Sequence, residues 1–161
     1  MKTLYLVRHA KSSRADPSLA DRDRPLDDRG TRDAPKMARR LARRHVRPDL
    51  LVSSPALRAL TTAQVFAEEL GCKRKDIVVD GRLYASSPEQ VLAVVEELDD
   101  KRDRVMLFGH NPEFSELARR LSREISEMPT CAVAELDFDT KSWSDVGAIE
   151  PVRAALDFPK K

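Results

Sequence analysis

The chain has 161 residues, of which 41% are hydrophobic, which suits one domain with one core over residues 1–161. Its 29 Lys and Arg against 27 Asp and Glu leave a net charge of +2, which argues against a dedicated nucleic-acid or membrane binder. The two cysteines, Cys72 and Cys131, lack CxxC or Cys/His spacing, so neither a disulfide framework nor a zinc site is expected. No window approaches the ~20 apolar residues of a membrane span, and MKTLYLV is too short for a signal-peptide core. We expect a soluble, cytoplasmic monomer with no nucleic-acid or membrane partner.

Four short apolar runs are predicted as strands, at residues 3–7, 49–53, 76–80 and 104–108. Helical periodicity predicts helices at 34–42, 55–70 and 88–99, and a fourth that begins at Pro112. Three pairs place a capping side chain before a proline at the predicted first helical position: Ser54-Pro55, Ser87-Pro88 and Asn111-Pro112. The alternation of strands and helices predicts an α/β three-layer sandwich, with a mostly parallel sheet and helices on both faces.

Two segments depart from this alternation. Residues 130–138 and 142–152 are predicted as a late β pair at a sheet edge, around a turn at 139–141. Residues 11–30 join the first strand to the first helix over more than the roughly 2–6 residues usual for such a turn. The four Arg and five Asp of this segment fit a solvated crossover, a lid or a binding surface, and all three stay open.

Polar side chains follow three of the predicted strands. Arg8 and His9 end the first, Arg58 lies one turn into the helix after the second, and His110 follows the fourth. Because ligands bind beyond the carboxyl ends of parallel strands, we expect these side chains to meet in one crevice. Two arginines, two histidines and two helix N-termini suit a phosphoryl group. The third histidine, His45, falls among arginines near the end of the first helix and is interpreted as structural.

This cluster favours phosphoryl chemistry over other site types. Arginine does not ligate metals, so no metal or other cofactor is expected. No GxSxG motif is present and neither cysteine stands at a strand end beside a histidine, which argues against a Ser or Cys hydrolase. An uncharged imidazole is a competent nucleophile, and Arg8 and Arg58 are expected to lower the pKa of His9 and keep it neutral. His9 would then form a phosphohistidine that water hydrolyses, while the arginines and His110 hold the oxygen charges.

Three motifs resemble the histidine phosphatase superfamily: Arg8-His9-Ala10 at its RHG tripeptide, SSPALRALTTA at 53–63, and Gly109-His110-Asn111-Pro112. RPLDDRG at 24–30 matches its RPLxxxG segment, so the resemblance runs from residue 1 to about 121. The small size and the forms RHAKSS and GHNPEFSELA are most similar to SixA-type phosphohistidine phosphatases. The resemblance implies a phosphoglycerate mutase-like fold, a hydrolase with His9 as nucleophile, and a phosphate pocket formed by Arg8, Arg58 and His110. Ser12 matches a family position that bears Ser or Thr and is expected as a pocket neighbour.

The chain departs from the family pattern at two points. Ala10 replaces the usual glycine, which matters only if that residue needs a positive φ. No match exists for the Glu or Asp general acid of mutases and phosphomonoesterases; Asp80 and Glu89 lie nearby, but Glu89 fits a helix start for dipole reasons. Imidazole leaves phosphorus more readily than an alkoxide does, so the site suits phosphohistidine, and the expected partner is a histidine-phosphorylated protein.

Other functions stay open at this point. A small-molecule phosphomonoesterase of the same superfamily would use Asp80, Glu113 or another acid. A mutase is less expected, because it needs a closed cavity that this short chain can hardly build. A phosphoryl-binding module without turnover has no need of the nucleophile His9.

Overall fold

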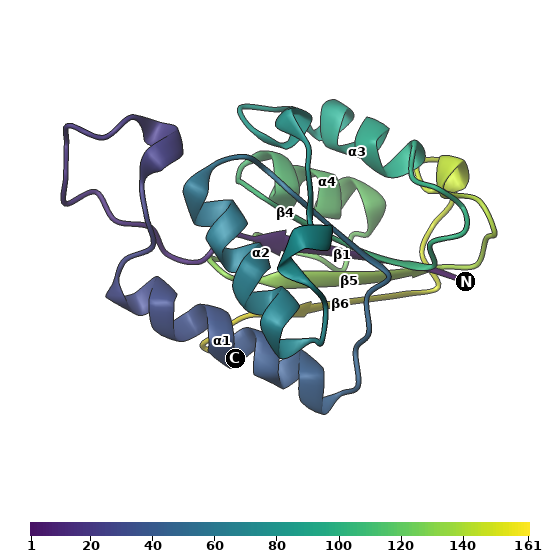
Figure 1. Ribbon diagram of the computed structural model, residues 1–161. Helices are drawn as coiled ribbons and strands as arrows, with labels where there is room; N and C mark the ends of the chain where they lie inside the picture. Colours follow the sequence, from purple (N-terminus) through teal and green to yellow (C-terminus); the bar gives the residue numbers. More distant parts are fainter.

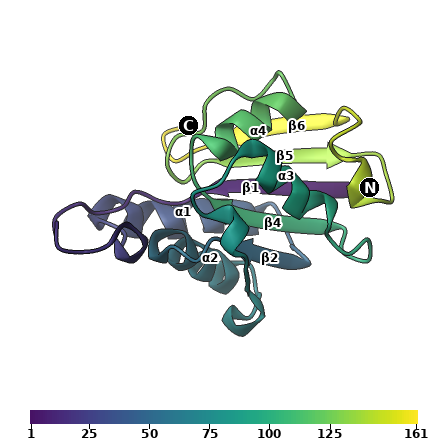
Figure 2. The same cartoon turned by 90° about the horizontal axis from the view of Figure 1, so that it is seen from above.

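The computed structural model describes residues 1–161 and contains one six-stranded sheet in the order β3-β2-β4-β1-β5-β6. The strands are β1 (Lys2–Arg8), β2 (Leu50–Ser53), β3 (Val78–Val79), β4 (Arg104–Gly109), β5 (Val133–Phe138) and β6 (Arg153–Asp157). The first four run parallel to one another, whereas β5 is antiparallel to both β1 and β6. Figure 2 shows β6 at one edge of the sheet and β2 toward the other. The predicted, mostly parallel sheet is confirmed.

Helices cover both faces of the sheet, α1 (Asp28–Arg43) and α2 (Leu57–Glu69) on one and α3 (Pro88–Glu96) and α4 (Glu113–Leu121) on the other (Figure 1). Each face has its own hydrophobic cluster, because successive strand residues point to opposite sides. In β1, Leu6 packs with the α3 and α4 side and Val7 with the α1 and α2 side. The predicted three-layer sandwich is therefore confirmed. None of the helices is both long and apolar enough to cross a bilayer.

The connection between β1 and α1 is shorter than the sequence predicted, because α1 begins at Asp28. Asp27 caps this helix, and its carboxylate accepts a hydrogen bond from Gly30 N at 2.8 Å. Gly30 is required there: a Cβ would stand 2.1 Å from the Lys11 carbonyl oxygen. The remaining loop contains the short 3₁₀ helix η1 (Asp21–Asp23) and projects beyond the sheet (Figure 1).

Only one of the three predicted proline caps is confirmed. Ser87 caps α3, and its hydroxyl accepts from Gln90 N at 3.2 Å. The helix α2 begins instead at Leu57, and α4 begins after Pro112. The side chain of Ser54 does not cap α2 because it bonds a histidine across the sheet edge, as described below.

The late β pair lies at the predicted edge, but its second strand was misplaced. Residues 142–152 form turns and the 3₁₀ helix η4 (Trp143–Asp145), and β6 begins only at Arg153. Trp143 explains the difference, because its fully buried indole donates from Nε1 to the Arg102 carbonyl at 2.6 Å. That contact anchors a turn where the sequence pattern suggested a strand.

Candidate active site

The carboxyl ends of β1, β2 and β4 are adjacent, because β4 lies between the other two. One polar cavity of 260 Å³ occupies this edge and brings together all the predicted site residues: Arg8, His9, Ser12, Arg58 and His110. The other lining residues are also polar, namely Lys11, Arg14, Asp21, Arg24, Asn111 and Thr130. Four of these six are charged, and three of those are cationic, so the cavity is suited to an anion.

His9 is 8% exposed and its ring has one defined tautomer. The Ala10 carbonyl can only accept, so Nδ1–H donates to it at 2.7 Å and the lone pair lies on Nε2. Burial, together with the charges of Arg58 and Arg8, lowers the pKa of His9 to about 4, although the hydrogen bond to the Ala10 carbonyl acts in the opposite direction. The expectation of a lowered pKa holds, but burial rather than the arginines is its largest cause. Ala10 has no positive φ, so the missing glycine introduces no backbone strain.

Arg58 is 6% exposed and is held by the loop between β1 and α1. Its Nη1 donates to the Asp21 carbonyl at 2.7 Å and its Nη2 donates to the Asp21 carboxylate at 3.0 Å. Thr62 ties the start of α2 to the nucleophile segment, since its hydroxyl donates to the Arg58 carbonyl and accepts from Ala10 N. The guanidinium is therefore fixed in place.

His110 is oriented by Ser54, which the sequence analysis did not single out as a site residue. The Ser54 hydroxyl lies 2.8 Å from His110 Nε2 and accepts from Ala56 N at 3.1 Å. Its own proton can bond Nε2, and in that arrangement the ring proton lies on Nδ1. Burial, followed by the charges of His9 and Arg58, lowers the pKa of His110 to about 3, so the ring is neutral.

Three nitrogens around this cavity are buried without a hydrogen-bond partner: Arg8 Nε, Arg58 Nε and His110 Nδ1. Arg8 is anchored through Nη1, which donates to the Met128 carbonyl at 3.0 Å. A buried donor left unpaired costs roughly 1–3 kcal/mol. All three side chains line the cavity, although these nitrogen atoms themselves have almost no exposed surface.

Asp21 is a site residue that the sequence analysis missed. Besides bonding Arg58, its carboxylate accepts from Tyr84 OH at 2.7 Å and from Arg24 Nε at 3.1 Å. The Tyr84 hydrogen bond, followed by those of Arg58 and Arg24, holds the pKa of Asp21 well below its usual range. Arg24 also donates to Ser12 Oγ at 2.9 Å. The RPLxxxG resemblance pointed to this loop, but composition could not show which of its five Asp residues bonds Arg58.

The two carboxylates considered as general acids lie in different places. Asp80 accepts from Arg82 Nη2 at 2.9 Å, which holds its pKa low, and it lines no cavity at the site. Glu113 is 5% exposed and lines an adjoining cavity of 320 Å³. Glu89 is exposed and pairs with Arg120 at 2.8 Å, and His45 is exposed beyond the end of α1.

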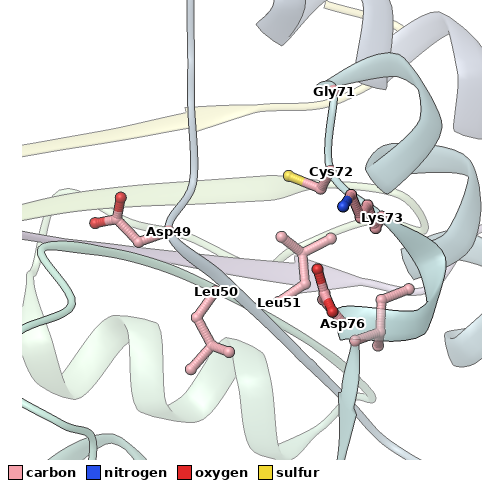
Figure 3. Close-up of a pocket in the computed structure, with 8 residues that line it drawn as sticks. Asp49, Leu50, Leu51, Gly71, Cys72, Lys73 and Asp76 are labelled. Carbon is pink, nitrogen blue, oxygen red and sulfur yellow. The ribbon is translucent and has the colours of Figure 1, made fainter.

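A further cavity of 270 Å³ lies at the amino end of β2, away from this site (Figure 3). It is lined by Asp49, Cys72, Lys73 and Asp76 among others, with no histidine or arginine. Burial raises the pKa of the Cys72 thiol, so it is a poor nucleophile. No group of three or more His, Cys, Asp or Glu side chains is placed to hold a metal ion.

The sequence profile of the histidine phosphatase superfamily (branch 1) matches residues 4–85, which contain the Arg8, His9 and Arg58 positions. The chain belongs to the histidine phosphatase superfamily. An uncharacterised protein of Mycobacterium tuberculosis is 31% identical over 161 residues, which cover 93% of this chain and 96% of that protein.

Solved structures agree with this membership. The crystal structure of the candidate phosphohistidine phosphatase SixA from Agrobacterium tumefaciens is 32% identical, with a TM-score of 0.78 over 84% of this chain and 91% of that one. The protein histidine phosphatase SixA complexed with tungstate shares the fold at 21% identity, with a TM-score of 0.78 over 97% of this chain and 94% of that one. The phosphoglycerate mutase-like fold and the SixA-type branch are therefore confirmed. The chain is a hydrolase of the histidine-nucleophile phosphatase type.

Proposed function

We propose that this phosphatase hydrolyses phosphohistidine in proteins through a covalent phosphohistidine at His9. The observation that carries the proposal is the state of the His9 ring, which is neutral and protonated on Nδ1, so Nε2 is free to attack. The cavity that His9 lines is also lined by Arg8, Arg58 and His110, whose side chains can donate hydrogen bonds to the transferring oxygens. A nucleophile and an oxyanion cradle thus share one site.

The reaction has two displacements. In the first, His9 Nε2 forms a bond to phosphorus while the substrate P–N bond breaks, and its electron pair returns to the leaving imidazole. In the second, a water oxygen bonds phosphorus and the P–N bond to His9 breaks, which releases inorganic phosphate. Arg8, Arg58 and His110 donate to the phosphoryl oxygens in both steps, and Ser12 borders the same cavity.

The nucleophile's cavity holds no carboxylic acid that could protonate a departing alcohol. An ester needs a proton donor for its departing alkoxide. The one carboxylate in this cavity, Asp21, is ionised and accepts from Arg58, Tyr84 and Arg24, so it has no proton to give. A phosphohistidine ring that is protonated on its second nitrogen leaves as neutral imidazole without that help, which favours phosphohistidine over a small-molecule phosphate ester.

Access to the cavity is compatible with a protein substrate. Lys11 and Arg14 are exposed and line its rim on the projecting loop. A phosphorylated side chain on a protein surface can therefore reach the site, with these cations on its approach.

The test compares kcat/KM for a phosphohistidine peptide with values for sugar, nucleotide and phosphoglycerate esters. We expect the peptide to be preferred by at least about tenfold, and His9→Ala to abolish its hydrolysis. A strong preference for any of the esters would contradict the substrate assignment. His9→Ala activity equal to that of the wild type would contradict the nucleophile.

A further inference from the structure

Glu113 is a buried carboxylate that the proposed reaction leaves unused. It is 5% exposed, and its one hydrogen bond is accepted by Oε2 from Ser86 N at 3.2 Å. Its carboxylate takes part in none of the ion pairs of the molecule, and burying a carboxylate without a cation is costly. Its place in the first turn of α4 offsets part of that cost through the helix dipole. Its other oxygen, Oε1, has no partner in the chain and is not among the fully buried atoms, so it is open to a hydrogen-bond donor in the cavity.

The cavity that Glu113 lines continues from the cavity of the nucleophile. The two share Asp21, Arg58, His110 and Asn111, whereas His9 lines only the first. In an in-line displacement the leaving group departs on the side of phosphorus opposite the nucleophile. The cavity beyond the shared residues, away from His9, is therefore where the leaving group lies.

The two cavities differ in charge. The nucleophile's cavity adds Lys11, Arg14 and Arg24 to the shared residues. The second cavity adds no cation, and its shared Arg58 is already paired with Asp21. Glu113 and the ring of Tyr84 are what it offers to a ligand.

We propose that the second cavity binds the substrate's leaving group and that Glu113 selects a cationic nitrogen base there. This specificity rests on the proposed phosphatase function. A protonated phosphohistidine ring donates from its second ring nitrogen to Glu113 while its other nitrogen carries phosphorus. When the P–N bond breaks, the electron pair returns to that nitrogen, and the ring leaves as neutral imidazole with its N–H still bonded to the carboxylate. Glu113 thus favours the reactive, protonated form of the substrate without transferring a proton.

Tyr84 also lines this subsite. Its ring packs edge-on against His110 at 5.6 Å, and the Arg22 guanidinium lies 5.5 Å from its centre. The ring therefore already tolerates a cation at its π system. A flat imidazolium is suited to a wall of this kind.

The experiment measures Glu113→Gln on two substrates, a phosphohistidine peptide and p-nitrophenyl phosphate, whose leaving group carries no positive charge. Glutamine keeps an oxygen for Ser86 N and removes only the charge. We expect kcat/KM for the peptide to fall at least about tenfold, the value of a charge-assisted hydrogen bond. For p-nitrophenyl phosphate we expect kcat/KM to stay the same or to rise, because its leaving group departs as an anion. Glu116→Gln, on the same helix but away from the cavity, is the matched control and should leave both substrates unaffected.

Three outcomes would overturn the inference. Equal losses on both substrates would assign Glu113 to the fold, which a lowered thermal midpoint would corroborate. A loss on the ester alone would make Glu113 a general acid, and no loss on either would make it inert. If the wild type hydrolyses the peptide and Glu113→Gln hydrolyses it equally well, only this inference is contradicted. A wild type that hydrolyses the ester through His9 but not the peptide contradicts the proposed substrate as well.

Discussion

Replacing Asp21 by alanine tests whether this carboxylate positions the Arg58 guanidinium. The change removes the 3.0 Å bond to Arg58 Nη2, the bond from Tyr84 OH and the bond from Arg24 Nε. The Asp21 backbone carbonyl still accepts from Arg58 Nη1 at 2.7 Å, so Arg58 is loosened but not released.

The size of the effect follows from what remains. Losing one positioned donor in a site of this type costs about 3 kcal/mol, or roughly a hundredfold in rate. Because one of the two Asp21 contacts to Arg58 survives, we expect about half of that, which is roughly a tenfold fall in kcat/KM. The Asp21 side chain is 51% exposed, so its ion pairs are screened by solvent and stability should fall by only about 1 kcal/mol or less.

Steady-state hydrolysis of p-nitrophenyl phosphate and thermal unfolding measure the two quantities. Asp23→Ala is the matched control, because Asp23 lies in the same 3₁₀ helix, is exposed and lines no cavity at the site. An Asp21→Ala variant as active as the wild type, or more active, would refute the reasoning. It would show that the carboxylate competes with substrate for Arg58 rather than orienting it.

Three further predictions concern the charge, packing and titration of the site. Arg58→Ala should lower kcat/KM at least about a hundredfold, and a loss under about twofold would place Arg58 outside the reacting centre. Gly109→Ala should destabilise the fold by about 1–3 kcal/mol, since its Cβ would stand 2.4 Å from the Phe114 ring. Urea unfolding measures this loss, and an unchanged midpoint would show that the ring moves freely. The pKa values of His9 and His110, about 4 and about 3, lie below the ordinary 6.5, so the unfolded chain binds more protons as pH falls below 6.5. The free energy of unfolding should therefore decrease from pH 6.5 to 4. The decrease should be less steep in a variant that carries both His9→Asn and His110→Asn, and an equal dependence on pH in that variant would assign the effect to other groups.

The part of the site that the sequence predicted is the part set by strand ends. Arg8, His9 and His110 directly follow or end buried strands, and Arg58 follows one turn later, so their convergence needs only a parallel sheet with β1, β2 and β4 adjacent. The Ser87 cap was also predictable from local sequence, because its hydrogen-bond partner, Gln90 N, lies only three residues along the chain.

Contacts between distant segments could not be read from local pattern. Ser54 looked like a helix cap, but its hydroxyl bonds His110, 56 residues away. Asp21 is one of several acids in a charged loop, and its partners Arg58 and Tyr84 lie on other elements. Trp143 turned a predicted strand into a turn by bonding Arg102. In each case a long-range hydrogen bond outweighed the local preference.

The most direct test of the central claim is to trap the phosphorylated enzyme. Incubation with ³²P-labelled phosphohistidine peptide, followed by a rapid alkaline quench, should leave acid-labile label on the wild-type chain at His9. His9→Ala should carry none, and Arg58→Ala, which keeps the nucleophile, should carry label that forms more slowly. Product formation by the wild type with no label on His9 at any quench time, or label of equal amount on His9→Ala, would contradict the covalent mechanism.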